Sequence, residues 1–307
     1  MKKALGYILL LISLESCFLF TGGGPGPKPV PDPDPLPQFL ETPALYPIQK
    51  GLIDEASGMV ASTTMPGNLW VEQDGNTSSA IHLLSASGQY LGKIDTWAYN
   101  RDWEDMADGP GPEEGVNYLY LGDIGDNSQN SEIYSVFRFK EPTSLNENYP
   151  AHEEIRFRYA DQPSGWDAEA MFVDPLTKDI YIITKRQLFS VRVYRLVYPY
   201  SPITENTAEF LGTIPLSSIT AADISADGQQ IILKNYDAAY YWRLRKDESI
   251  YEALKRTRDI GLPYYVETQG EAICFDYKEE GYYTLSERPY NTEPVNLQYY
   301  QRKTTDQ

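Results

Sequence analysis

Glu169-Ala170-Met171-Phe172-Val173-Asp174 is the stretch that decides the fold, because its pattern recurs along the chain. An acidic residue comes first, then usually a small residue, an apolar stretch, and often Asp before a turn. The other copies begin at Glu55, Glu104, Asp223 and Glu271, so successive copies start 49, 65, 54 and 48 residues apart. These spacings are typical of the four-stranded blades of a β-propeller, with one insertion in the second unit.

The segments between the copies are also typical of strands. Runs rich in Val, Ile, Tyr and Phe alternate with turn clusters such as Asp227-Gly228, and only residues 248–258 have a helical pattern. We therefore predict an all-β, five-bladed β-propeller over residues 44–303. The last unit has three strands, and residues 44–48 would supply its fourth strand and close the ring. The alternative is a β-sandwich with loosely similar strands.

The composition restricts the function. The 307 residues carry a formal net charge of −18, which repels polyanions, so nucleic acid is not expected as a partner. Only two His are present, His82 and His152, and neither has the spacing of a zinc site or a Ser-His-Asp hydrolase. The chain also has no phosphate-binding Gly loop before a helix and no dinucleotide fingerprint.

The N-terminal residues indicate export. Lys2-Lys3, an apolar run and Leu14-Glu15-Ser16-Cys17 match the signal peptide and lipidation site of bacterial lipoproteins. We expect residues 1–16 to be removed, Cys17 to carry lipid, and residues 17–43, rich in Pro and Gly, to tether a monomeric domain in the cell envelope, facing the periplasm or the outer surface. An uncleaved anchor is the alternative, although Glu15 would make it costly.

The repeated acids predict a metal site. The N-terminal ends of the innermost strands of a propeller open on one face, so these carboxylates would face one another. They belong to Glu55, Glu104, Glu169, Asp223 and Glu271. Their mutual repulsion would raise their pKa values unless a cation sat among them, and oxygen ligands of this kind suit Ca²⁺. Alternatively, the acids accept hydrogen bonds from neighbouring backbone N–H groups.

Loops expected on the same face carry a mixed set of charged and polar side chains. Those that we consider candidates for ligand binding are Asp102, Asp123, Asp126, Asn127, Lys185, Lys234, Glu287 and Arg288. Basic groups around a cation-filled channel would attract a phosphate, carboxylate or uronate. Equally, Lys185, Lys234 and Arg288 could only neutralise the acids. Asp74 and Arg186 belong to the same loops, and Trp103 and Trp166, just before two of the acids, either stack on a ligand or pack between blades.

Four segments resemble those of an uncharacterised group of secreted bacterial β-propeller proteins. They are Arg101 to Asp105, Gly122 to Asn127, Asp167 to Ala170 and Gly270 to Ala272, and the resemblance spans residues 53–290. It implies a propeller and export but no activity. One acid per blade is also similar to calcium-dependent apyrases, and this architectural likeness implies Ca²⁺ ligands at Glu104, Glu169 and Glu271.

Three functions remain open from the sequence. We expect first a membrane-tethered lipoprotein with a central Ca²⁺ that binds an anionic small molecule or glycan. The second is a Ca²⁺-dependent phosphoester or nucleotide hydrolase in which a ring acid, with Glu169 as the candidate, activates water. The third is a non-catalytic scaffold for envelope proteins.

Overall fold

Strands form wherever the chain alternates β-branched and aromatic residues between turn clusters, and these strands pair into antiparallel sheets of four. The computed structural model describes residues 35–75, 77–148, 150–288 and 294–304. The prediction of an all-β fold is confirmed. The expected helix is present but shorter than predicted, as α1 (Ile250–Lys255), where Ser249 and Glu252 form a capping box.

The strands follow one another in groups of four. The first group is β2 (Ala56–Ala61), β3 (Asn68–Gln73), β4 (Ala80–Ser85) and β5 (Tyr90–Asp95). The second is β6 (Trp103–Pro110), β7 (Asn117–Asp123), β8 (Tyr134–Lys140) and β9 (His152–Tyr159). The third is β10 (Ala168–Val173), β11 (Ile180–Thr184), β12 (Val191–Leu196) and β13 (Asn206–Ile214). The fourth is β14 (Ile219–Ile224), β15 (Gln230–Asn235), β16 (Ala239–Arg243) and β17 (Ile260–Leu262). The last is β18 (Gly270–Phe275), β19 (Gly281–Ser286), β20 (Asn296–Gln301) and β1 (Ala44–Pro47).

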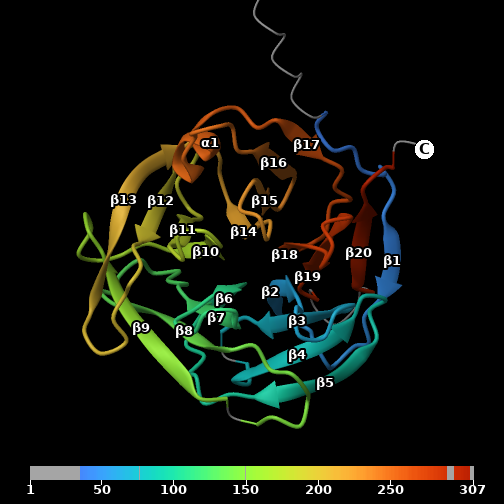
Figure 1. The fold of residues 1–307 in the computed structure, drawn as a ribbon, viewed down its shortest axis with the longest axis horizontal. Helices are drawn as coiled ribbons and strands as arrows, with labels where there is room; N and C mark the ends of the chain where they lie inside the picture. Colours follow the sequence, from blue (N-terminus) through green and yellow to red (C-terminus); the bar gives the residue numbers. More distant parts are fainter. Residues whose placement is uncertain (1–34, 76, 149, 289–293, 305–307) are drawn as a thin grey trace, which may run out of the picture. The chain divides into compact units, whose positions relative to one another are not determined.

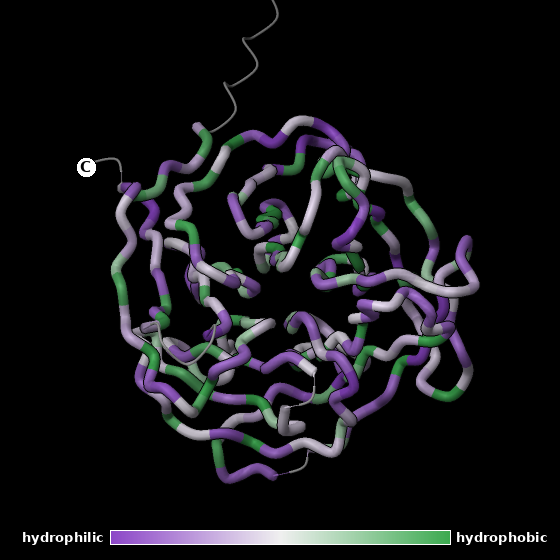
Figure 2. The backbone as a smooth tube through the Cα atoms, turned by 180° about the vertical axis from the view of Figure 1, so that it is seen from behind, coloured by the Kyte–Doolittle hydropathy of each residue, from purple (hydrophilic) through white to green (hydrophobic). Residues whose placement is uncertain are grey.

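The groups are arranged in a ring (Figure 1). The first strand of each group, β2, β6, β10, β14 or β18, lies nearest the centre, and each of these inner strands contacts the inner strands on both sides of it. Figure 2 shows the ring from behind, with hydrophobic and hydrophilic residues interspersed along the strands around its whole circumference. The inner strands therefore bring residues distant in the sequence to one central axis.

The ring is closed by the strand that the sequence predicts for this role. β1 pairs antiparallel with β20, from Ala44 opposite Tyr299 to Pro47 opposite Asn296, and Phe39 forms a further bridge with Arg302. The edge of β20 is thereby covered by the first strand of the chain. On the opposite side of the ring, β9 and β13 pair in parallel at their outer edges.

The hydrophobic core consists of five separate clusters, each between two neighbouring sheets. The cluster between the second and third groups, for example, contains Tyr120, Val136, Met171 and Ile182, all of which are fully buried. The remaining clusters fill the other four spaces between sheets in the same way. Because apolar side chains occupy both faces of every sheet, the centre of the ring is left to the polar ends of the inner strands.

The predicted signal peptide, the lipidation site at Cys17 and most of the tether lie outside the described residues. Residues Leu36–Gln307 form one compact unit. In the part of the chain that the structure describes, no helix has the length and apolar character needed to span a membrane.

Candidate metal centre

The inner strands share a β-bulge near their N-terminal ends. In β6, β10, β14 and β18 the register with the next strand shifts by one residue, at Glu104, Glu169, Thr220 and Glu271 respectively. A bulged residue has no partner across the ladder, so its side chain can point in a direction that a regular strand does not allow. The bulges place three carboxylic acids and one hydroxyl at equivalent positions around one end of the ring, which we call the mouth.

Two of the five acids predicted to converge are not at this position. Glu55 precedes β2 and is exposed at the rim, where its nearest charged neighbours include Asp54 and Glu271. The corresponding residue of β2 is Ser57, which donates a hydrogen bond to the backbone carbonyl of Glu104 at 2.6 Å. Ser57 therefore takes the equivalent position in the first group, and Glu55 lies outside the bulge although it still acts electrostatically on Asp74 and Glu287.

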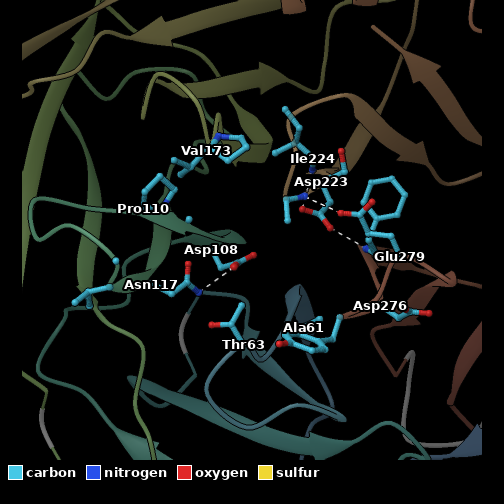
Figure 3. Close-up of a pocket in the computed structure, with 18 residues that line it drawn as sticks. Ala61, Thr63, Asp108, Pro110, Asn117, Val173, Asp223, Ile224, Asp276 and Glu279 are labelled. Atoms are coloured by element: carbon cyan, nitrogen blue, oxygen red, sulfur yellow. Dashed lines mark hydrogen bonds between the residues drawn. The ribbon is translucent and has the colours of Figure 1, made fainter.

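Asp223 likewise lies outside the bulge, three residues after the bulge residue Thr220. Its carboxylate accepts hydrogen bonds from the backbone N–H groups of Ile224 and Phe275, both at 2.8 Å. Together with Asp108 it lines a cavity of ≈ 380 Å³ near the C-terminal ends of the inner strands (Figure 3). Asp223 thus behaves as the alternative interpretation expects, as a backbone hydrogen-bond acceptor far along the strand from the mouth.

The buried acids Glu104, Asp167 and Glu169 form the centre of the mouth. One carboxylate oxygen from each lies within 4.8 Å of the other two, which is a separation that a metal ion could bridge. Glu104 and Glu169 are each 3% exposed and Asp167 is fully buried. Glu169 Oε2 is buried and receives no hydrogen bond. A buried carboxylate oxygen without a donor is costly, and a cation is one way to satisfy it.

Two donors hold Asp167 in place. The backbone N–H of Asp126 donates to Oδ1 at 2.8 Å, and Arg186 Nε donates to Oδ2. Because an ionised carboxylate has about four lone-pair sites, both oxygens keep the capacity to bind a cation. Asp167 lies two residues before the repeated acid Glu169, and the sequence did not identify it as a candidate ligand.

The electrostatics of the mouth are unfavourable for free carboxylates. Burial and the neighbouring Glu169, Asp74 and Asp102 hold the pKa of Glu104 well above its usual value. Burial raises the pKa of Glu169 to about 8, although Lys185 opposes this change. Both acids are therefore poised to release protons if a cation arrives.

Lys185 supplies part of the missing positive charge. Its ammonium forms an ion pair with Glu169 and lies 3.8 Å from Glu271 Oε1. Burial lowers the pKa of Lys185, but Glu169 and Glu271 outweigh this effect and the pKa is raised. Glu271 also accepts a hydrogen bond from the Tyr236 hydroxyl. Lys185 thus lies between Glu169 and Glu271, and this one ammonium group is near more than one carboxylate.

The other predicted ligand-binding residues have partners within the protein. Asp123 accepts from the Asp102 backbone N–H, Asp126 from Ser131 and Tyr134, and Asn127 from Arg186. Lys234 is fully buried, where it donates to the Gly270 carbonyl, and Arg288 pairs with Asp54 at 2.7 Å. Glu287 accepts from Gln269, and burial together with Glu271 raises its pKa to about 10. Trp103 is fully buried, so it packs between sheets.

Comparisons with known proteins give a likeness of fold only. No protein-family model matches the chain, and no curated protein is significantly similar to it. Among solved structures, the chain is similar to hydrazine synthase of Kuenenia stuttgartiensis, with 12% sequence identity and a TM-score of 0.38. The similarity covers 84% of this chain and 65% of that chain, so this protein spans slightly less than two thirds of its length.

Proposed function

We propose that the ring of sheets is a five-bladed β-propeller whose mouth holds Ca²⁺, and that the bound ion recruits an anionic small molecule or glycan. The five inner strands around one axis, the core clusters between neighbouring sheets and the closure by β1 support the propeller. The signal-peptide pattern before Cys17 supports export and a lipid anchor in the bacterial envelope.

The observation that carries the proposal is the buried trio Glu104, Asp167 and Glu169, with Glu169 Oε2 lacking any donor. The ligand atoms are all carboxylate oxygens, which favour hard cations. Ca²⁺ accepts irregular sets of oxygen ligands and waters, whereas Mg²⁺ demands a near-ideal octahedron. A bound cation would favour the ionised forms of Glu104 and Glu169, whose pKa values burial holds above the usual range.

A cation at this position would make the local potential less negative. Lys185 and Arg186, both in the loop after β11, already pair with Glu169 and Asp167, and an added Ca²⁺ would place a further positive centre beside them. A phosphate, carboxylate or uronate could then bind the ion directly and accept hydrogen bonds from the basic groups. The strongly acidic remainder of the protein would exclude polyanions.

Binding of uronate-containing oligosaccharides and sugar phosphates to the purified protein tests this function. We expect binding with Ca²⁺, no binding with EDTA, and at least tenfold weaker binding in Lys185→Gln. Lys140→Gln is the matched control, because Lys140 forms an exposed ion pair with Glu113 away from the mouth. Absence of binding, or binding that is the same with EDTA, would contradict the proposal.

A second candidate function is Ca²⁺-dependent phosphoester hydrolysis. Burial, opposed by the Gly75 backbone N–H and reinforced by Asp102, raises the pKa of Asp74 to about 6, close to what a general base needs near neutral pH. Glu169 is the candidate proposed from sequence for activating water. Hydrolysis of nucleoside diphosphates that disappears with EDTA and in Glu169→Gln would support this function, and turnover that survives both would exclude it.

A further inference from the structure

The Glu104 carboxylate takes part in a second group of acids. One oxygen each from Asp74, Asp102 and Glu104 lie within 4.8 Å of one another, as in the trio with Asp167 and Glu169. Asp74 directly follows β3, and Asp102 directly precedes β6. The two groups therefore share one buried side chain, that of Glu104.

The Glu104 carboxylate has no direct partner within the described residues. No hydrogen bond or ion pair reaches it, although the side chain is only 3% exposed. Burial and the negative charges of Glu169, Asp74, Asp102 and Glu271 raise its pKa. Lys185 attracts Glu104 electrostatically, but the ion pair of Lys185 is with Glu169. A single cation held by Glu104, Asp167 and Glu169 would leave Asp74 and Asp102 outside its ligand set.

The backbone around Asp102 is shaped to leave its carboxylate accessible. The Asp102 N–H donates to Asp123 Oδ1 at 2.9 Å, and the Asp102 carbonyl accepts from the Gly125 N–H at 3.2 Å, so the main chain is held on both sides. A Cβ on Gly75 would lie 2.7 Å from Asp102 Oδ1, and one on Gly125 would lie 2.6 Å from Oδ2 and overlap Glu104 Oε1. Two glycines thus leave the space that these carboxylate oxygens occupy.

We propose that Asp74, Asp102 and Glu104 hold a second Ca²⁺, and that Glu104 bridges the two ions. This inference rests on the proposed function, because it assumes the first ion at Glu104, Asp167 and Glu169. Metal ions that share a carboxylate sit about 3.5–4 Å apart, and such a pair clamps two oxygens of one phosphoryl group. The class of ligand that follows is a phosphate or phosphoester, in preference to a uronate.

Counting bound ions by native mass spectrometry of the whole protein tests the proposal. We expect two Ca²⁺ in the wild type, one in Asp102→Asn, one in Asp167→Asn, and none in Glu104→Gln. Glu113→Gln, which removes an exposed acid far from the mouth, is the control and should retain two. Circular dichroism and thermal melts in EDTA verify that each variant is folded.

The possible failures are distinguishable. One ion in the wild type that Asp167→Asn removes and Asp102→Asn leaves in place overturns the second site and retains the first. A wild-type protein that binds no ion overturns both sites. Inorganic phosphate serves as the second probe: we expect its affinity for the Ca²⁺-loaded protein to fall at least tenfold in Asp102→Asn. Equal affinities in wild type and variant would overturn the two-ion clamp, whatever the ion count.

Discussion

Replacement of Glu104 by Gln should change the stability of the protein in opposite directions with and without Ca²⁺. The substitution keeps the shape of the side chain and removes its charge. In EDTA the wild-type Glu104, whose pKa is held well above its usual value by burial and by its acidic neighbours, must take up a proton on folding. The substitution avoids this cost, so the free energy of unfolding should rise. In Ca²⁺ it removes a ligand shared by both groups of acids, so the variant should lose the stabilisation that the ion provides.

The proton balance sets the magnitude. Keeping a buried carboxyl protonated in the folded protein costs about 1.4 kcal/mol for each pH unit by which the solution lies above the ordinary carboxyl pKa. Removal of two such units, about 3 kcal/mol, would raise the melting temperature of the metal-free protein by roughly 6–12 °C. Ca²⁺ at a hundred times its dissociation constant should stabilise the wild type by about 2.7 kcal/mol and the variant by little.

Urea denaturation followed by tryptophan fluorescence at pH 8, in EDTA and in Ca²⁺, measures both effects. The control is Glu113→Gln, because Glu113 is exposed. Asp276→Asn would not serve, because the Asp276 carboxylate accepts hydrogen bonds from a backbone N–H and from a tyrosine hydroxyl. If Glu104→Gln destabilises the protein by the same amount in both conditions, the carboxylate is a structural acceptor and the reasoning is refuted.

Three further predictions follow from the same geometry. In EDTA the free energy of unfolding should fall as the pH rises from about 5 to 8. Burial raises the folded-state pKa values of Asp74 to about 6 and of Glu169 to about 8, so the folded protein binds more protons than the unfolded chain in this window. Urea titrations should show that Ca²⁺ flattens this slope, and a free energy of unfolding that rises with pH in EDTA would contradict the prediction. Gly125→Ala should weaken Ca²⁺ binding at least tenfold by calorimetry, whereas Gly261→Ala, with only Arg258 Nε at 3.6 Å from the added Cβ, should not. Phe39→Ala should cost about 3 kcal/mol in chemical denaturation, because the ring is 3% exposed and packs edge-on against Tyr282; a loss no larger than that of a surface substitution would mean that this segment does not seal the ring.

The strands were predictable because their signal is local. The run Ile180 to Ile183 appears as β11, Gln230 to Leu233 lies within β15, and residues 44–48 supply the closing strand β1. In each case alternating β-branched and aromatic residues between turns are sufficient to identify a strand. The ordered recurrence of these strands also indicated how many sheets to expect.

The position of the bulge was not predictable from the acidic pattern alone. Asp223 begins a sequence that resembles the other repeats, but the bulge in β14 falls at Thr220. A better signal is the distance to the turn, where the N–H groups of Asp174, Ser225 and Asp276 close equivalent turns. Counting back five residues from these gives Glu169, Thr220 and Glu271, and would have separated Asp223 from the residues of the mouth.

Asp74 and Asp167 show a second limit. Each lies just outside a strand, and at least one of its neighbours at the mouth, Glu104, comes from a different group of strands. Whether such loop residues meet depends on the angle between adjacent sheets and on backbone turns at Gly75 and Gly125, which a pattern of residue types does not encode. The sequence offered neutralisation of the repeated acids as one role of Lys185, but it did not identify Glu169 as the partner.

The most direct test of the central claim is an anomalous difference map from crystals of the protein grown in CaCl₂. We expect a peak bounded by Glu104, Asp167 and Glu169, with oxygen distances of about 2.3–2.6 Å. A map in which these three carboxylates surround no peak, with Lys185 still paired to Glu169 at saturating Ca²⁺, would contradict this expectation and identify the acids of the mouth as purely structural.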